Sequence, residues 1–512
     1  MTSVQTVCFQ GLNTTPVDVQ VQLASGLPAF ILVGLPDKAV AESKERVRAA
    51  LYALGIAFPA KRITINLAPS DLQKEGSHYD LPIALALLRA LGALPSDALQ
   101  GFVALGELAL DSRLMKATGI LSAALFASSQ KKGLICAFES GPEAAWAGEI
   151  PLIAARSLIE IINHFKGTQT LKAPEPLKET KLLHQKNIED VKGQALAKRA
   201  LLIAAAGRHN LLMCGPPGVG KSMLAERLPS LLPPLSPAEA LTATMIYSVA
   251  GLLKEGRLLT RRPFRNPHHS ASMAALVGGG LRGKPGEISL AHGGILFLDE
   301  LPEFQRNLLE ALRQPLESKE AVISRVNTHV SYPANAQLIA AMNPCACGYL
   351  GDPVKQCKKA PGCGARYASR LSGPLLDRID MHLQMEGLSP LGLQQVEQGK
   401  TSKELKTQVI KAYEAQRMRF PVAEKEDPLK EAPFLNGEVD FALLEPHLFL
   451  SREALCTVNN AVKRLHLSTR SYHKVLRLAR TIADLAHSHR IEKIHMLEAL
   501  TYRPPHALHK AA

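Results

Sequence analysis

The chain has 512 residues, 46% hydrophobic and 21% charged, which is the composition of a globular protein with several domains rather than of a disordered one. Apolar runs such as residues 81–94 are broken by Pro82 and Arg89 and no secretion signal opens the chain, so we expect a cytoplasmic protein with no membrane partner. The formal net charge of +14 indicates a polyanionic partner.

Residues 1–165 have the pattern of a mixed α/β domain. Alternating apolar residues predict strands, and apolar residues at helical spacing predict the helices between them. The expected strands are 17–23, 29–33, 62–67, 112–116 and 133–138, and the expected helices are 37–54, 80–94, one that ends at residue 129, and 158–165.

Short motifs in this domain resemble the protease-like domain of the Lon family. They are VGLPD at 33–37, GSHYD at 76–80 and GEL at 106–108. The active proteases carry a serine before the helix that follows the second motif and a lysine after a later glycine. When the glycines are superposed, His78 takes the serine position, with Ser77 beside it, and Leu121 or Ser122 takes the lysine position. Because a serine without a fixed base is a poor nucleophile, we expect a catalytically inactive domain.

Residues 166–186 are predicted to be a linker, because they contain Pro174, Pro176 and scattered lysines but little periodic apolar content. A helix expected over 187–206 then opens a second domain, 187–386.

Residues 209–222, HNLLMCGPPGVGKS, predict a phosphate-binding loop between a short strand and a helix. Its glycines let backbone N–H groups point at phosphate oxygens, and the dipole of the following helix adds positive potential. Lys221 is expected to reach the β- and γ-phosphates of ATP, and Ser222 to hold Mg²⁺. The expected cofactor-binding residues are Gly215, Pro216, Pro217, Gly218, Val219, Gly220, Lys221, Ser222 and Asp299.

The stretch 256–286 is rich in arginine and glycine and contains no acidic residue. Its cations are Arg257, Arg261, Arg262, Arg265, Arg282 and Lys284. A mobile basic loop can approach a phosphate backbone closely, so we expect these residues to bind DNA without sequence preference. The alternative is a surface loop with solvated arginines. A second projection, 320–335, is predicted to be a hairpin.

Two further apolar strands are predicted to end on polar side chains. Residues 295–298 are followed by Asp299, expected to orient Mg²⁺, and by Glu300, expected to polarise the attacking water. Residues 336–342 are followed by Asn343, which suits a sensor of the γ-phosphate. The alternative for Asn343 is a residue that supports the turn at Pro344.

Four of the 8 cysteines lie between residues 343 and 364, namely Cys345, Cys347, Cys357 and Cys363. Four thiolates around tetrahedral zinc would fold a loop that has few apolar groups of its own. Free thiols are the alternative in a reducing compartment, and the wide interval before Cys363 favours it for that residue.

Residues 387–512 are predicted to form a basic helical lid over the nucleotide. A helix is expected over 402–419, a proline-containing connection over 423–435, and three or four helices over 441–512.

Motifs in the second domain resemble AAA+ ATPases, and in particular the ComM/YifB family of magnesium-chelatase-like proteins. They are RPFRNPHH at 262–269, PGEISLAH at 285–292 and SGPLLDRID at 372–380, and the likeness extends over essentially the whole chain. The fold it implies is α/β: a Lon-protease-like domain, an AAA+ core with a parallel sheet, and a helical lid.

The same resemblance implies a hexameric motor that couples ATP and Mg²⁺ to helicase activity and branch migration. It would act on single-stranded and branched DNA in natural transformation and recombination, with a recombinase as a partner. In this class the arginine of LLDR is supplied to the ATP of the neighbouring subunit, so Arg378 is the expected finger and Arg470 the expected second sensor. A surface salt bridge is the alternative for each, and Arg366, Arg370 and Arg477 compete for these roles.

Two other functions remain open at this point. A metal-chelatase-type remodelling ATPase would share the AAA+ core, but its partners provide an acidic linker and a metal-binding adhesion domain that have no counterpart here. An ATP-dependent protease would need the missing serine–lysine pair.

Overall fold

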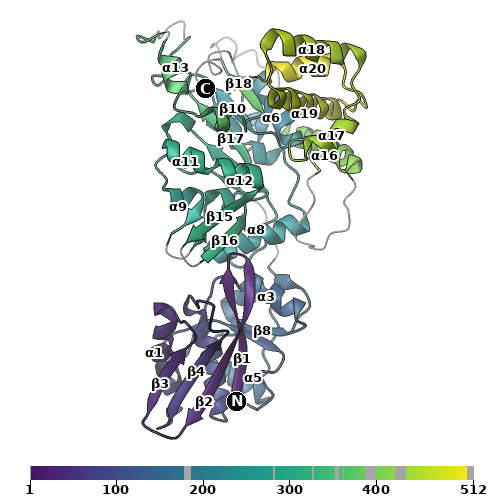
Figure 1. The fold of residues 1–512 in the computed structure, drawn as a ribbon. Helices are drawn as coiled ribbons and strands as arrows, with labels where there is room; N and C mark the ends of the chain where they lie inside the picture. Colours follow the sequence, from purple (N-terminus) through teal and green to yellow (C-terminus); the bar gives the residue numbers. More distant parts are fainter. Residues whose placement is uncertain are drawn as a thin grey trace. The chain divides into compact units, whose positions relative to one another are not determined.

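The computed structural model describes residues 2–177, 186–280, 283–325, 328–351, 357–360, 362–386, 399–420 and 434–503 (Figure 1). The chain divides into two compact units. Unit 1 takes residues 1–180, 241–259 and 324–331, and unit 2 takes residues 181–240, 260–323 and 332–512. Within the described ranges, no helix combines the length and the apolar content that a membrane span requires.

The predicted linker falls where the chain passes from unit 1 to unit 2, and its residues 178–185 lie outside the described residues. Two segments expected in the second domain, 241–259 and 324–331, belong to unit 1 instead. Helix α8 (Pro237–Ala250) therefore begins in unit 2 and ends in unit 1. The predicted lid shares unit 2 with the rest of the second domain.

Unit 1 is built on a mixed sheet that has seven strands in the part of the chain described. Its strands are β1 (Thr2–Gln10), β2 (Asn13–Ala24), β3 (Ala29–Val33), β4 (Arg62–Ala68), β5 (Phe102–Leu105), β8 (Gly133–Ala137) and β9 (Leu152–Ala155), in the spatial order β3-β4-β2-β1-β5-β8-β9. Its other elements are α1 (Lys38–Ala53), α2 (Asp80–Ala90), β6 (Glu107–Leu108), β7 (Leu114–Met115), α3 (Ile120–Ser129), α4 (Gly141–Ala144) and α5 (Leu158–Phe165). The prediction of a mixed α/β domain is confirmed.

Most of the predicted elements of unit 1 are present, but one predicted strand is shorter than expected, and β1, β5, β6 and β9 were not predicted. The strand predicted over 112–116 is only the two-residue β7, which pairs with β6. β1 was not predicted, because the polar residues Gln5 and Thr6 interrupt its apolar run. Antiparallel pairing with β2 along its whole length holds β1 in the sheet, so a tertiary contact overrides the weak local pattern.

Unit 2 contains a sheet whose five strands, within the described residues, pair parallel. In spatial order they are β11 (Phe264–Arg265), β14 (Ile295–Leu298), β17 (Gln337–Met342), β10 (Leu211–Cys214) and β18 (Met381–Gln384). Strands buried on both faces are continuous apolar runs, which made β14 and β17 recognisable in the sequence. Because the strands run in one direction, the turns after β10, β14 and β17 share one edge of the sheet.

Short elements surround this sheet. The helices are α6 (Ala195–Gly207), α7 (Lys221–Ala225), α9 (Met273–Leu276), α10 (Glu287–Leu290), α11 (Arg306–Ala311), α12 (Arg313–Ser318), α13 (Gly362–Ala368) and α14 (Gly373–Leu376). Two two-stranded sheets pair β12 (Gly278–Gly279) with β13 (Lys284–Pro285) and β15 (Glu320–Arg325) with β16 (Thr328–Pro333). The second lies within the projection predicted over 320–335, whose residues 326–327 lie outside the described residues. The helix expected from residue 187 begins only at Ala195, because Asp190 accepts from the backbone N–H of Asn187 and closes a separate short turn.

The C-terminal helices pack on the sheet domain as part of one hydrophobic core. They are α16 (Ser402–Arg419), α17 (Phe441–Leu444), α18 (Arg452–Leu465), α19 (Thr469–Leu485) and α20 (Lys493–Thr501). Their buried residues belong to the same cluster as those of α6, β10 and β17. Of the predicted lid, residues 387–398, 421–433 and 504–512 lie outside the described residues, and these include residues 423–433 of the predicted connection.

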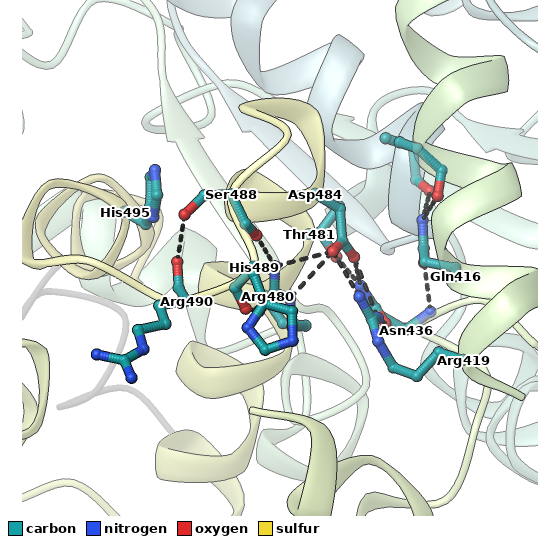
Figure 2. A network of polar contacts seen from close by, with 12 residues as sticks. Gln416, Arg419, Asn436, Arg480, Thr481, Asp484, Ser488, His489, Arg490 and His495 are labelled. Carbon is teal, nitrogen blue, oxygen red and sulfur yellow. Dashed lines mark hydrogen bonds and ion pairs between the residues drawn. The ribbon is translucent and has the colours of Figure 1, made fainter. Parts of the chain in front are cut away.

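A buried polar network also ties these helices to the start of β10 (Figure 2). Asp484 on α19 accepts from Arg480 Nε at 3.0 Å and from Arg419 Nη2 at 2.6 Å. Thr481, one turn earlier, contacts Nε2 of His209 at 2.8 Å, two residues before β10. Because breaking a buried ion pair costs about 3–5 kcal/mol, these contacts hold α19 at a fixed place against α16 and the strand that leads to the phosphate loop.

Candidate nucleotide-binding site

The turn after β10 has the backbone geometry of a phosphate-binding loop. Gly218 and Gly220 have φ of +80° and +94°, in the left-handed region that side chains disfavour. A Cβ on Gly215 would lie 2.7 Å from the carbonyl oxygen of Met385, so this position also requires glycine. α7 begins at Lys221, directly after the loop, and the first turn of a helix has N–H groups free to bind an anion.

The ammonium group of Lys221 is held inside this loop beside the predicted sensor. Its Nζ donates to the carbonyl oxygens of Gly215 and Pro216 at 2.7 and 2.9 Å. It also donates to Oδ1 of Asn343 at 3.0 Å. Burial lowers the pKa of Lys221. β17 pairs with β10, and this pairing brings Asn343 to the loop across a separation of 122 residues.

A hydroxyl and a carboxylate meet beside the lysine. Oγ of Ser222 donates to Oδ2 of Asp299 at 2.6 Å, and the backbone N–H of Glu300 donates to Oδ1 of Asp299 at 2.9 Å. Such oxygen atoms are the ligands that Mg²⁺ prefers, so Ser222 and Asp299 fit the ion that the sequence predicts. Bound there, Mg²⁺ would neutralise charge on the phosphate oxygens of ATP.

Glu300 has a strained backbone and a histidine neighbour that was not predicted. Its φ of +51° lies in the left-handed region, a conformation that clusters at functional positions. Its Oε2 lies 3.8 Å from Nδ1 of His269, whose ring centroid is 4.1 Å from that of His268. His269 follows β11, and the parallel pairing of β11 with β14 brings it to Glu300. The adjacent histidines stood out in the sequence, but nothing there indicated which strand they follow.

The two predicted catalytic arginines lie together at the other end of β10. Asn210, directly before that strand, donates Nδ2 to the carbonyl oxygen of Arg378 at 2.8 Å. Arg378 and Arg470 line one cavity of about 680 Å³ together with Asn210. β10 has four residues and so spans roughly 13 Å. The strand therefore lies between both arginines and the phosphate loop of their own chain.

Each of these arginines has a carboxylate near it. Nη2 of Arg378 lies 2.6 Å from Glu317, and the side chain of Arg378 is 15% exposed. Nη1 of Arg470 lies 4.0 Å from Asp377, and the side chain of Arg470 is 73% exposed. The contact of Arg470 is long and solvated, so it binds the arginine weakly.

Of the three arginines that compete for these roles, one lies beside Arg378 and two lie elsewhere. Arg477 lines the same cavity as Arg378. Arg370 pairs with Glu303 at 2.9 Å, three residues after Glu300, and Arg366 is exposed on α13. Only Arg477 therefore shares the surface that Arg378 and Arg470 form.

The basic stretch 256–286 is not the mobile loop that its composition predicted. Residues 264–265 are β11, a strand of the central sheet. Arg262 is 8% exposed and donates to both carboxylate oxygens of Glu239 at 2.9 and 3.0 Å. Arg265 forms a two-point ion pair with Glu287 at 2.5 and 2.7 Å. Carboxylates outside the stretch bind both guanidinium groups, which argues against the phosphate contacts expected of Arg262 and Arg265.

The other four predicted DNA contacts differ in their surroundings. Arg257 pairs with Glu255 at 2.6 Å in unit 1. Arg282 lies outside the described residues, and Arg261 is half-buried. Lys284 is exposed on β13, next to Gly278 and Gly279 of β12. Lys284 is thus the described member of the set whose side chain is best exposed to a polyanion.

The four predicted cysteines converge. Sγ of Cys345 lies 3.3 Å from Sγ of Cys347, and Sγ of Cys357 lies 3.2 Å from Sγ of Cys363. The sulfur atoms of Cys345, Cys357 and Cys363 all lie within 4.8 Å of one another. The wide interval before Cys363 therefore does not separate its thiol from those of Cys345 and Cys357.

The protease-like positions in unit 1 are engaged in structural contacts. Oγ of Ser77 donates to Glu107 at 2.5 Å. His78 is buried against the carbonyl oxygen of Val7, and burial lowers its pKa to about 4. Leu121 and Ser122 are buried in α3.

Comparisons with known proteins cover nearly the whole chain. Residues 187–391 match the family described as magnesium chelatase, subunit ChlI; residues 19–140 match subunit ChlI of Mg-chelatase; and residues 399–503 match the ChlI C-terminal family. The chain is 43% identical over 499 residues to "Competence protein ComM" of Haemophilus influenzae, covering 96% of this chain and 95% of the relative. It is 41% identical over 502 residues to "Uncharacterized protein YifB" of Escherichia coli, covering 98% and 96%. It is 27% identical over 169 residues to "Magnesium-chelatase 38 kDa subunit" of Rhodobacter capsulatus, covering 30% and 48%.

The parallel sheet, the phosphate loop and the two strand-end motifs, taken with these matches, define a magnesium-chelatase-like protein of the AAA+ ATPase class. Within that class, the family is shown by the 41–43% identity to ComM and YifB over nearly the full length of the chain. The chain belongs to the ComM/YifB family of magnesium-chelatase-like AAA+ ATPases.

Proposed function

We propose that this chain is one subunit of a homo-hexameric ATPase that acts as a DNA helicase and promotes branch migration. The observation that carries the proposal is the distribution of polar groups about β10. Lys221, Asp299 and Asn343 gather after its carboxyl end, whereas Arg378 and Arg470 lie at its amino end. Phosphoryl transfer uses an arginine to stabilise charge, and a neighbouring copy in a closed ring would supply it.

Two observations support DNA as the substrate: the net charge of the chain and its similarity to a named relative. The net charge of +14 favours a polyanion, and one relative at 43% identity carries the name of a competence protein. We propose that the motor works in the cytoplasm on single-stranded and branched DNA during natural transformation and recombination, together with a recombinase. A contact between DNA and Lys284 is part of this proposal, whereas Arg262 and Arg265 are left out of it.

The proposed cofactors are ATP and Mg²⁺, with Ser222 and Asp299 as the magnesium ligands and Glu300 as the residue that orients water. Zinc, held by the four clustered thiols, is the proposed second metal.

A remodelling ATPase of the metal-chelatase type is the second candidate, because the core resembles a magnesium-chelatase subunit. The two candidates differ in what stimulates ATP hydrolysis: DNA stimulates a DNA motor, whereas a protein partner would stimulate a remodelling ATPase. Forked, three-way and four-way DNA should each raise ATP hydrolysis and be unwound if the DNA proposal holds. ATP hydrolysis that none of these substrates stimulates, with no strand displacement, would favour the remodelling ATPase.

The supply of an arginine across a subunit boundary is tested by mixing two inactive variants. Arg378→Ala keeps an intact phosphate loop, and Lys221→Ala keeps an intact Arg378. In an equal, random mixture about a quarter of the interfaces join the two intact halves, so ATP hydrolysis should return in part. If the variants co-assemble, as judged by light scattering, and hydrolysis stays at the level of the separate variants, Arg378 does not act across an interface.

A further inference from the structure

The four-thiol cluster has the dimensions of a metal site rather than of two disulfides. Thiolates around tetrahedral zinc, with Zn–S of about 2.3 Å, lie about 3.8 Å from one another. The sulfur–sulfur separations are 3.3 Å between Cys345 and Cys347, 3.2 Å between Cys357 and Cys363, and at most 4.8 Å among Cys345, Cys357 and Cys363, which is the scale of that value. A disulfide would need sulfur atoms about 2.05 Å apart. Four cysteine ligands complete the coordination of the ion, as in zinc sites that stabilise a fold.

The first two cysteines belong to a turn that packs against the phosphate loop. The backbone N–H of Gly348 donates to the carbonyl oxygen of Cys345 at 2.9 Å and closes this turn. A Cβ on Gly348 would lie 2.6 Å from Cδ of Pro217 and 3.9 Å from Cγ of Asn343. The turn therefore touches both the loop that would hold the phosphates and the sensor that follows β17.

We propose that zinc bound by Cys345, Cys347, Cys357 and Cys363 clamps this turn onto the phosphate loop, so that zinc occupancy sets the affinity for nucleotide. A metal that joins the turn to Cys357 and to the start of α13 removes its freedom to move away from Pro217. Without the metal, the thiols contribute little to holding it there, and the backbone of the loop loses its support. This inference rests on the proposed function, since it takes the loop as the ATP site.

The test measures zinc and nucleotide on the same full-length protein. Elemental analysis should find one zinc per chain in the wild type and none in the double variant Cys357→Ser with Cys363→Ser. Affinity for a fluorescent ATP analogue in Mg²⁺ should fall at least about tenfold in that variant, because displaced binding groups cost on that order. Cys456→Ser is the control, since Cys456 is exposed on α18, and it should keep both zinc and affinity.

A second measurement covers the case in which the double variant does not fold. Wild-type protein is stripped by a chelator, returned to Mg²⁺ alone, checked by circular dichroism, and then given Zn²⁺. Affinity should fall and recover with zinc. Purified protein with no zinc and with disulfides at these positions, or zinc loss at constant affinity, would overturn the clamp. If zinc-loaded wild type binds no nucleotide, the ATPase proposal itself fails, and the clamp fails with it.

Discussion

The phosphate loop and the basic stretch after it both carry cations, but the two regions satisfy them with different partners. Nζ of Lys221 donates to two backbone carbonyls and an amide oxygen, all neutral acceptors. Arg262 and Arg265 each donate to both oxygens of a carboxylate. A cation held by neutral oxygens keeps its full charge for an incoming phosphate, whereas a cation paired with a carboxylate has most of its charge cancelled locally.

The pKa of Glu239, the carboxylate that pairs with Arg262, reflects the same pairing. Burial alone raises the pKa of Glu239, but the charges of Arg262 and Arg208 hold it below its ordinary value. Glu239 therefore stays ionised and keeps Arg262 occupied. The partners of a basic residue, and not its charge alone, therefore decide whether it is available to bind a polyanion.

The largest effects should come from the phosphate loop, if its lysine is indeed the available cation. Lys221→Ala should lose about 3 kcal/mol or more of ATP binding energy, because it removes charged hydrogen bonds to phosphate. Glu300→Gln should bind ATP normally but turn it over about 10²- to 10⁴-fold more slowly, since it keeps the magnesium ligands and lacks the base. Binding titrations and steady-state hydrolysis measure the two quantities.

The matched control for these variants is Lys411→Ala, an exposed lysine on α16. Unchanged ATP affinity in Lys221→Ala would show that the ammonium group of Lys221 does not bind phosphate. Normal turnover in Glu300→Gln would remove that residue from catalysis.

The second prediction tests whether Arg262 is structural. Arg262→Ala removes the two-point partner of Glu239 and leaves only the longer contact with Arg208 at 3.9 Å, so it should destabilise the fold by about 3–5 kcal/mol. Arg306→Ala, on an exposed position of α11, should change stability by less than about 0.5 kcal/mol. Urea unfolding of both variants measures the difference. If Arg262→Ala lowers stability by less than about 1 kcal/mol, which is the range of a surface ion pair, the ion pair between Arg262 and Glu239 is not structural.

The smallest effect is expected at Lys284, the exposed cation of the same region. Lys284→Ala should lower the slope of log affinity for DNA against log salt by about one and leave ATP affinity unchanged, because a phosphate contact releases roughly one counterion. Fluorescence anisotropy on single-stranded DNA at several salt concentrations measures the slope. An unchanged slope would show that exposure alone, like composition alone, does not identify a DNA contact here.

Much of the candidate site could be predicted because its motifs combine residue type with spacing. A glycine-rich turn must follow a strand and precede a helix, so Lys221 and Ser222 could be placed before the fold was known. The buried strands that end on Asp299 and Asn343 were visible as apolar runs. Helix α16 appeared with its predicted bounds, because Thr401 and Glu404 form a capping box at its start.

His269, the pairing of Arg262 and the places of Arg378 and Arg470 relative to β10 could not be predicted in this way. Each depends on a partner far away in the chain: Glu300 for His269, Glu239 for Arg262, and Asn210 for Arg378. Spacing along the chain carries no record of which strands become neighbours or of which end of a strand a distant loop reaches.

The amino-acid sequence by itself therefore determined the α/β class, the phosphate loop and its strand-end partners, because local propensity and buried apolar runs are properties of short segments. Only the tertiary structure decided which cations are paired with carboxylates, and that the sulfur atoms of Cys345, Cys357 and Cys363 gather within 4.8 Å with Cys347 beside Cys345. The physical reason is that electrostatic and coordination contacts act over a few ångströms in space, and the order of the strands in the sheet sets which side chains come within that range.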